Sequence, residues 1–384
     1  MGITLAALRR YAVARSLFPP VTLKRAIDRM GFVQADPIRA PARAQDLILR
    51  HRVKNYRAGD LERVYAELGV EEDFFVVYGF VSRALEELMH PRTVRGAVAW
   101  VSKPWPPSRR KLAELLMAFV RERGAVHPRD ADAHFALGSV KNYWGGSSNA
   151  TTHLLEAMHY RGMLRVVRRD RGIRIYASRE LGAEPVDTAA RISRIDALVD
   201  AVVNVYAPLP ASTLSPLVRR LRYAAPQWRK EFARALKRAK ERLKHARVDG
   251  LDWYWPANED PGEFEPDSRV RFLAPFDPVV WDRARFELLW NWAYRFEAYT
   301  PAPRRKLGYY ALPLLWHDRV IGWANLSVAE GKLLTDIGYV ASDPPKDESF
   351  HAELQNEIER MRAFLRLTTS EPPASRRRRV STLS

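Results

Sequence analysis

The spacing of apolar residues changes along this chain of 384 residues, and the change predicts two kinds of structure. Before residue 256 apolar positions recur every three to four residues, which predicts amphipathic helices. After the Pro- and acid-rich linker 256–266, aromatic and β-branched residues dominate short segments, which predicts strands. We expect helices near 3–16, 22–30, 41–54, 60–68, 281–291 and 350–367, and strands at 269–273, 294–299, 308–315, 320–326 and 333–340. The pattern predicts an α+β protein that ends in a small antiparallel, β-barrel-like domain.

Residues 108–180 have a characteristic order of elements. Three predicted helices precede two β-rich segments around an Asp-Arg-Gly turn: 110–123, 128–136, 149–161, 163–168 and 173–177. Ser147 and Ser148 are good N-cap candidates for the third helix. Three helices followed by a basic hairpin are typical of a winged-helix domain, whose third helix commonly enters the major groove of DNA.

A similar order recurs downstream, with helices at 192–206, 212–222 and 226–246 before a strand region at 247–256. The N-terminal part could be another copy, although no hairpin is visible there. The chain has no strict sequence repeat, so the similarity is one of element order. We therefore expect tandem winged-helix domains with these boundaries: 1–105, 106–184, 185–260, the β domain 261–345, a helical segment 346–370 and a disordered basic tail 371–384.

The charge of the chain points to a polyanionic partner. It has 63 Lys and Arg against 45 Asp and Glu, a formal net charge of +18. The first 57 residues hold twelve of the cations and only three acids, and a second basic run covers 229–247. Such a balance favours nucleic acid or an anionic membrane surface. No apolar run approaches the roughly 18 residues that a membrane span needs, so we expect a cytoplasmic, nucleoid-associated protein.

The common catalytic signatures are missing. There is no phosphate-binding Gly-rich loop, no HExxH and no GxSxG. The chain has no cysteine, which excludes disulfides, thiolate metal sites and cysteine nucleophiles. The nine histidines do not cluster. We therefore expect neither a metal nor a cofactor.

One segment, residues 31–47, combines polar groups in a pattern that suits chemistry. Gln34 and Asp36 are two residues apart, so in extended backbone they face the same side. Arg39, Arg43 and Arg50 follow at helical spacing and would form one basic stripe. A simpler interpretation also exists, because Asp36 before a proline is a good helix N-cap.

Three ordered blocks of sequence resemble one family. The first is Gln34-Ala35-Asp36 with Arg43-Ala-Gln-Asp-Leu47 behind it, the second is Leu273-Ala-Pro-Phe-Asp-Pro-Val-Val-Trp-Asp-Arg-Ala-Arg285, and the third runs from Tyr299 to Pro313. Their order and spacing resemble the winged-helix DNA glycosylases of the AlkZ and YcaQ type over roughly residues 5–345. Two stretches depart from the family pattern: residues 74–82 lack its Trp and His, and residues 322–325 read Gly-Trp-Ala-Asn where relatives tend to show Gly-Arg-x-Asp.

The resemblance implies a monofunctional DNA repair glycosylase for N7-alkylated purines, whose range in some members includes interstrand crosslinks. Asp36 would stabilise the oxocarbenium-like sugar and activate water, and Gln34 would position that water. The expected partner is alkylated or crosslinked double-stranded DNA, bound by a monomer. Candidate DNA contacts are Arg39, Arg43, Arg50, Arg52, Ser147, Asn149, Arg168, Arg171, Tyr309 and Tyr310.

Two other functions are open at this point. A non-catalytic winged-helix regulator or architectural factor would bind specific DNA sequences and would give Gln34 and Asp36 no role beyond capping. An RNA-binding protein would have the same charge and would prefer structured RNA to damaged DNA.

Overall fold

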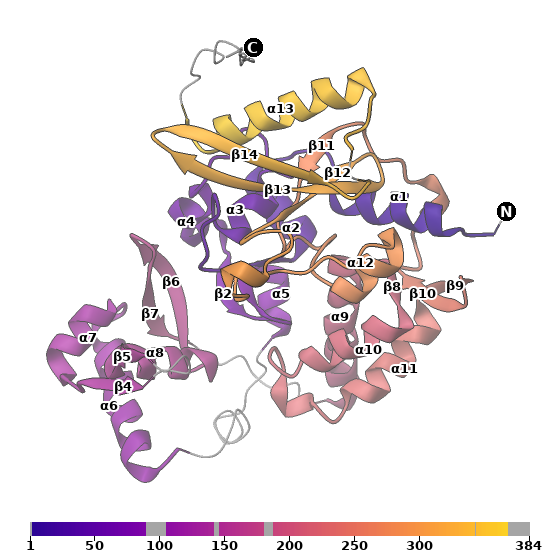
Figure 1. Cartoon of the computed structure of the whole chain (residues 1–384). Coiled ribbons are helices and arrows are strands. Elements are labelled where there is room, and N and C mark those ends of the chain that lie inside the picture. Colours follow the sequence, from indigo (N-terminus) through magenta and orange to yellow (C-terminus); the bar gives the residue numbers. More distant parts are fainter. Residues whose placement is uncertain (1, 90–104, 142–145, 180–186, 342, 368–384) are drawn as a thin grey trace, which may run out of the picture.

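A computed structural model describes residues 2–89, 105–141, 146–179, 187–341 and 343–367, and shows an α+β fold (Figure 1). The predicted tail 371–384 lies outside these residues. The N-terminal helices are α1 (Leu5–Ser16), α2 (Leu23–Met30), α3 (Ala44–Leu49), α4 (Asp60–Val64) and the 3₁₀ turn η1 (Tyr65–Leu68). The first two begin at threonine N-caps, Thr4 and Thr22. Within the described residues, no helix is long and apolar enough to span a membrane.

Helix α3 is much shorter than the predicted helix 41–54. Residues 37–43 form an irregular loop, so Arg39 and Arg43 lie outside the helix. Pro37 and Pro41 supply no backbone N–H and disfavour helical geometry in the residues before them. The expected basic stripe along one helix is therefore wrong.

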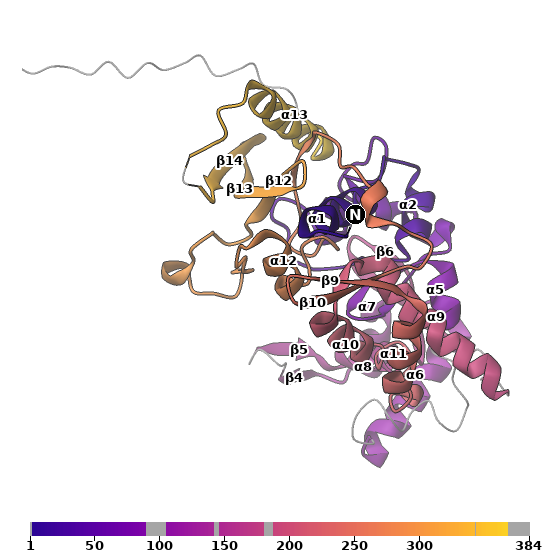
Figure 2. The same ribbon diagram turned by 90° about the vertical axis from the view of Figure 1, so that its right-hand side faces the viewer.

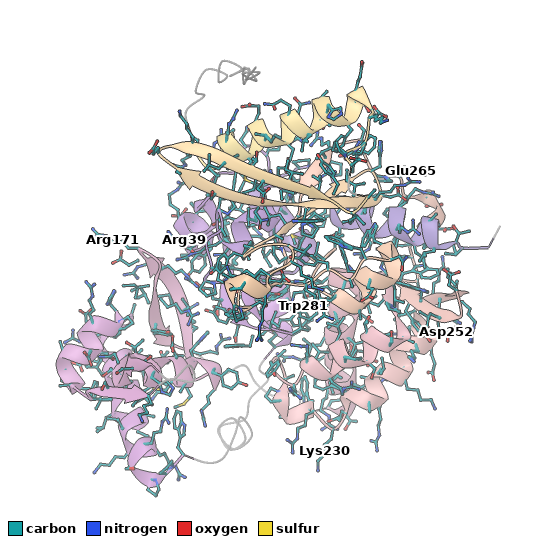
Figure 3. All side chains as sticks on the ribbon, in the orientation of Figure 1. Arg39, Arg171, Lys230, Asp252, Glu265 and Trp281 are labelled. Carbon is teal, nitrogen blue, oxygen red and sulfur yellow. The ribbon has the colours of Figure 1, made fainter. Side chains whose placement is uncertain are left out.

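A five-stranded antiparallel sheet joins two regions that are far apart in sequence. Its order is β1-β3-β2-β6-β7. The strands are β1 (Phe32–Gln34), β2 (Glu71–Phe74), β3 (Tyr78–Val81), β6 (Leu164–Asp170) and β7 (Ile173–Ser178). The expected boundary at residue 105 therefore separates segments that share one sheet. Arg171 and Gly172, at φ 47° and 86°, form the turn of the β6–β7 hairpin (Figure 3).

The middle of the chain has the predicted element order with one addition, a two-stranded ribbon before the third helix. Its elements are α5 (Arg83–Leu88), α6 (Pro107–Arg123), α7 (Pro128–Phe135), β4 (Ser139–Lys141), β5 (Ser147–Asn149) and α8 (Ala150–Tyr160). The N-cap of α8 is Asn149, which accepts from the backbone N–H of Thr152 at 2.8 Å. Ser147 and Ser148 lie in β5 instead, so their prediction as caps was wrong.

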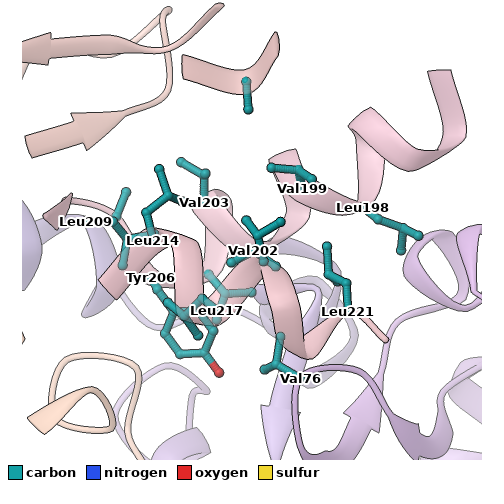
Figure 4. Packing of buried hydrophobic residues seen from close by; sticks show 14 of the residues in the cluster. Val76, Leu198, Val199, Val202, Val203, Tyr206, Leu209, Leu214, Leu217 and Leu221 are labelled. Atoms are coloured by element: carbon teal, nitrogen blue, oxygen red, sulfur yellow. The ribbon is translucent and has the colours of Figure 1, made fainter. Parts of the chain in front are cut away.

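The next region packs three helices against a small sheet and against the first region. Its elements are α9 (Thr188–Tyr206), β8 (Leu209–Pro210), α10 (Ala211–Arg220), η2 (Pro226–Trp228), α11 (Phe232–Arg242), β9 (Lys244–Val248) and β10 (Leu251–Trp255). The predicted helix 226–246 is thus interrupted and ends before β9. Figure 4 shows apolar side chains of α9 and α10 meeting Val76, which lies between β2 and β3.

The C-terminal region contains an open antiparallel sheet in the order β11-β12-β13-β14, with helix α13 beside it (Figures 1 and 2). Phe350 and Met361 of α13 share a core with Val270 and Phe272 of β11. The predicted strand 294–299 was wrong, because Tyr294 is buried as part of an irregular segment. The elements are η3 (Pro261–Glu263), β11 (Val270–Phe272), α12 (Arg283–Trp290), η4 (Ala302–Arg304), β12 (Leu312–Trp316), β13 (Arg319–Ala329), β14 (Lys332–Tyr339) and α13 (Glu348–Phe364).

Candidate functional site

Gln34 and Asp36 lie at the point where β1 ends and the loop 37–43 begins. Gln34 is opposite Gly79 of β3 in the sheet register. An added Cβ at Gly79 would collide with the backbone oxygen of Val33 and with the ring of Phe32, so only glycine allows this close approach. Asp36 lies beyond the strand and its Oδ1 accepts from the N–H of Ile38 at 2.9 Å. It caps a short turn, and the helix-cap interpretation was wrong.

Both side chains keep hydrogen-bonding capacity that the protein does not use. The Oε1 atom of Gln34 is buried and has no hydrogen-bond partner in the structure. Asp36 is half-buried, and the N–H of Ile38 is its one hydrogen-bond donor among the described residues. Desolvation raises the pKa of the Asp36 carboxyl, although the bond from Ile38 opposes the shift. A buried acceptor without a donor is costly, so it calls for an explanation, and a bound water or ligand that supplies the donor is one.

Two tyrosines from the C-terminal region lie near enough to Asp36 for its charge to act on them. Burial raises the pKa of Tyr310 well above its usual value, and the negative charge of Asp36 raises it further. Burial and the same charge raise the pKa of Tyr299. The rings of Phe276 and Phe296 are 5.1 Å apart, and that of Phe296 is 5.3 Å from Tyr310. We call these four residues, Phe276, Phe296, Tyr299 and Tyr310, the aromatic wall.

The members of the wall differ in exposure. Tyr299 is 68% exposed, whereas Tyr310 is 2% exposed and its hydroxyl has no hydrogen-bond partner among the described residues. Tyr309, the neighbour of Tyr310, is 44% exposed and lies under the guanidinium of Arg305 at 5.0 Å. Tyr309 and Tyr310 were both predicted to contact DNA. Tyr309 is accessible to a large ligand, whereas the hydroxyl of Tyr310 is buried near Asp36.

The loop before Tyr309 is held by two polar side chains. Glu297 accepts from the backbone N–H groups of Lys306, Leu307 and Gly308, and although burial opposes the shift these donors lower its pKa. Asn325 donates to the backbone oxygen of Leu307 at 2.8 Å and covers Gly308, whose φ is 120°. Residues 322–325, which depart from the family pattern, thus place the Asn325 amide where it holds this loop.

Two of the predicted DNA-contacting arginines are buried. Arg52 is 0% exposed and donates to both carboxylate oxygens of Asp277, at 2.8 and 3.0 Å. The Arg50 side chain is 4% exposed and donates to Glu357 at 2.7 Å. The burial of Arg52 conflicts with its prediction as a DNA contact, because it has no surface that DNA could reach. Arg50 faces α13 instead of the loop 37–43.

Arg39 and Arg43 have different surroundings. Arg39 is exposed and forms no ion pair within the described part of the chain. Arg43 pairs with Glu62, and its guanidinium reaches Gly172 in the turn of the β6–β7 hairpin. The hairpin turn therefore lies beside the loop that follows Asp36, and Figure 3 shows Arg39 and Arg171 on the same side of the molecule.

The β6–β7 hairpin is fixed to β2 by a row of ion pairs. The sheet register pairs β2 with β6 at one position, Glu72 with Val166. Arg169 donates to both oxygens of Glu72, at 2.7 and 2.6 Å. On either side, Arg165 pairs with Glu71 at 2.7 Å and Arg179 with Asp73 at 2.7 Å.

Arg168 and Arg171 are exposed and form no ion pair among the described residues, so they remain available to DNA. Ser147 is likewise exposed on β5. The side chain of Asn149, by contrast, is used as the N-cap of α8. Of the hairpin and ribbon residues predicted to contact DNA, Asn149 therefore has a structural role.

Residues 27–364 match the model of the family described as "DNA glycosylase AlkZ-like". The chain belongs to this family. Its fold is similar to that of the Streptomyces sahachiroi DNA glycosylase AlkZ, with a TM-score of 0.62 over 95% of this chain and 97% of that one. The two sequences are 14% identical, so the likeness concerns the fold. The predicted family is confirmed, and membership supports a glycosylase activity on DNA.

The other departure of this AlkZ-like chain, residues 74–82, has a structural account. Phe75 and Val76 enter the core shared with α9 and α10. Tyr78 donates its hydroxyl to Glu72 at 2.6 Å. The segment therefore supports the sheet that carries Gln34. No group of His and acidic side chains in the described ranges could hold a metal ion.

Sequence reasoning missed Tyr299 as a neighbour of Asp36, and it missed Glu297 and Asn325 as supports of the tyrosine loop. Tyr299 opens the third sequence block of this AlkZ-like chain, which is the signal that could have found it. Glu297 follows no local pattern, because its three donors come from a turn that begins nine residues later.

Proposed function

We propose that this AlkZ-like protein hydrolyses the N-glycosidic bond of N7-alkylated purines in double-stranded DNA, and that crosslinked purines are among its substrates. One observation carries the proposal: the buried, unpartnered Oε1 of Gln34 lies two residues from the half-buried Asp36, beside the aromatic wall. The family supplies the reaction class. A non-catalytic regulator gives these two incompletely paired polar groups no role in DNA binding.

The chemistry needs few protein groups. An N7-alkylated purine is already cationic, so it leaves the sugar without a general acid. The remaining requirements are a negative charge near the sugar, whose transition state resembles an oxocarbenium ion, and a placed water on its far face. Partial burial strengthens the field of Asp36 at the sugar. The Gln34 amide accepts from the attacking water, and because water is the nucleophile the enzyme is monofunctional.

DNA binding would use the exposed groups around Asp36. We propose that the regions 106–184 and 185–260 act as winged-helix domains. Arg39, Arg168 and Arg171 would then contact phosphates on either side of the lesion. Ser147 would add a contact from β5, and Tyr299 and Tyr309 would stack against distorted DNA. These sites all lie on one chain, so a monomer is sufficient.

The test is base release from a duplex with one N7-methylguanine, under single-turnover conditions. We compare the wild type with Asp36→Asn and Gln34→Ala, and use Asp28→Asn as the matched control because Asp28 is exposed on α2. Asp36→Asn should lower the rate by about 10³-fold or more, and Gln34→Ala by about 10–100-fold, while DNA affinity is retained. The control should match the wild type.

The same series on a crosslinked duplex tests the wider substrate range. A wild type that binds DNA tightly but releases no base would contradict the glycosylase proposal and favour the regulator. Equal rates for Asp36→Asn and the control would leave a glycosylase but remove Asp36 from its chemistry.

A further inference from the structure

A cavity of about 490 Å³ lies between the loop 50–57, β11 and α13. Gln34, Asp36 and the residues of the aromatic wall do not line this cavity. We call it the basic cavity. One carboxylate lines it, that of Glu357, against six cationic side chains: Arg50, Lys54, Arg57, Arg269, Arg271 and Arg360.

Glu357 organises the arginines of the basic cavity. Its Oε1 accepts from Arg50 at 2.7 and 2.8 Å and from the backbone N–H of Phe272 at 2.9 Å. Its Oε2 accepts from the Nε of Arg360 at 3.0 Å. Both oxygens are therefore occupied, and the carboxylate holds two guanidinium groups at the cavity wall without filling the cavity.

The positive charge of the cavity is only partly balanced by its surroundings, where Glu353 pairs with Arg360 at 3.6 Å. Lys54 and Arg57 form no ion pair within the described parts of the chain. Asp267 pairs with Arg271 at 2.6 Å and with Arg269 at 3.7 Å, outside the lining. Burial lowers the pKa of Arg50, and the charges of Arg360 and Arg271 lower it further despite Glu357. These cations therefore repel one another, and an anion bound in the cavity would reduce that repulsion.

The cavity also has an apolar wall. The rings of Tyr56 and Phe364 stack with their centroids 6.3 Å apart, and the guanidinium of Arg50 lies over Phe364 at 5.6 Å. Its volume falls in the range of sites that hold small organic ligands. A lone inorganic ion would leave much of this space empty.

We propose that the basic cavity binds the phosphate oxygens of a nucleotide unit. Planar guanidinium groups match two phosphate oxygens at once, and a flexible lysine adds a point charge. Two sources have this chemistry: a free nucleotide, and the backbone or an end of a DNA strand outside the Asp36 site. In either case the site is separate from the one proposed for base release.

The test uses the full-length protein and pyrophosphate as the probe. Calorimetry should show saturable binding to the wild type at low salt. Lys54→Ala/Arg57→Ala removes two cations whose loss orphans no partner, and should weaken binding about tenfold or more. Lys332→Ala/Lys346→Ala removes two exposed cations outside the cavity and should leave binding unchanged within about twofold. Thermal melting checks that each variant is folded.

Two further arms identify the source of the phosphate. If the ligand is DNA, pyrophosphate displaces undamaged duplex in an anisotropy assay, and Lys54→Ala/Arg57→Ala lowers DNA affinity more than the control pair does. If it is a free nucleotide, ADP competes with pyrophosphate while DNA binding stays at the level of the control pair. No saturable binding of pyrophosphate to the wild type, or equal losses in the two double variants, would overturn the proposal.

Discussion

Residues 34–36 precede the loop 37–43 and helix α3, and residues 50–52 follow them. The polar side chains of the two segments differ in how completely their hydrogen bonds are satisfied. Arg52 is fully buried and donates to both oxygens of Asp277. Gln34 is less buried, yet its Oε1 has no partner, and Asp36 has a single backbone donor among the described residues. From the sequence, Gln34 and Asp36 were candidates for catalysis, and Arg50 and Arg52 were candidates for contact with DNA. The completeness of their hydrogen bonding separates structural groups from available ones.

The difference follows from the cost of burying polar groups. A buried charge without a partner destabilises a fold strongly, so Arg52 requires Asp277. An unsatisfied neutral acceptor such as Gln34 Oε1 costs about 1–3 kcal/mol, which a folded protein can tolerate. A substrate that supplies the missing donor recovers that cost on binding.

The largest expected effect comes from breaking the satisfied pair. Arg52→Leu leaves the buried Asp277 without its cation and should lower the free energy of unfolding by about 3–5 kcal/mol. Arg39→Leu makes the same substitution at an exposed position and should have little effect. Chemical denaturation measures both variants. A loss below about 1 kcal/mol for Arg52→Leu would contradict the structural role.

Asp46 lies between these extremes. It is buried and accepts from the hydroxyl of Tyr56 at 2.7 Å and from the N–H of Gly59 at 3.0 Å. Desolvation nonetheless raises the pKa of Asp46 to about 6. The protonated Asp46 carboxyl therefore contributes its full stabilisation of the folded state below about pH 4, and this contribution is lost as the pH rises through about 6.

Asp46→Asn keeps the acceptor and removes the charge. It should therefore stabilise the protein at pH 8 by up to about 3 kcal/mol and change little at pH 4. Urea denaturation at both pH values measures this, with Asp28→Asn as the exposed control. Destabilisation at pH 8 would show that the carboxylate is better satisfied than its hydrogen bonds indicate.

The hairpin offers the same comparison on one strand, because Arg169 is paired and Arg168 forms no ion pair within the described ranges. The double variant Arg168→Ala/Arg171→Ala should weaken DNA binding about tenfold. It should also reduce the slope of log affinity against log salt concentration by the equivalent of nearly two phosphate contacts. Stability should not change. Anisotropy titrations at several salt concentrations give both quantities, with Lys332→Ala/Lys346→Ala as the control of equal charge. An unchanged salt slope would remove the hairpin from the DNA interface.

The smallest effect concerns Tyr310, whose buried hydroxyl has no partner. Tyr310→Phe removes the unsatisfied group without changing the ring, and should raise the free energy of unfolding by about 1 kcal/mol. Tyr294→Phe is the matched control, since its hydroxyl donates to Ala311 at 2.7 Å and its loss should destabilise by a similar amount. Thermal denaturation shows whether each variant is more or less stable than the wild type.

Local spacing predicted most helices and four strands of the C-terminal sheet, because amphipathic periodicity is a property of contiguous residues. It failed at 41–54, where the prolines of the loop 37–43 delay the helix, and at 294–299, where aromatic residues pack without forming a strand. It could not show that β2 pairs with β6, since their contact depends on residues nearly a hundred positions apart.

The candidate site was accessible to sequence reasoning only in part. Gln34 and Asp36 were found from their spacing and from the family resemblance, and their catalytic roles remain predictions. Their surroundings were not accessible, because Tyr299 and Tyr310 meet Asp36 through the tertiary fold. The Arg52–Asp277 pair joins positions 225 residues apart, so an arginine that looked available from local sequence is a core residue.

The row of ion pairs along β2 has a consequence for biosynthesis. Its acids meet their arginines 94, 97 and 106 residues later in the chain. At ribosomal rates of 5–20 residues per second the acids wait roughly 5–20 s for those cations to be synthesised. During that interval β2 presents unneutralised carboxylates, which discourage the nascent strand from pairing with another chain. The N-terminal region is therefore completed by a later part of its own polypeptide.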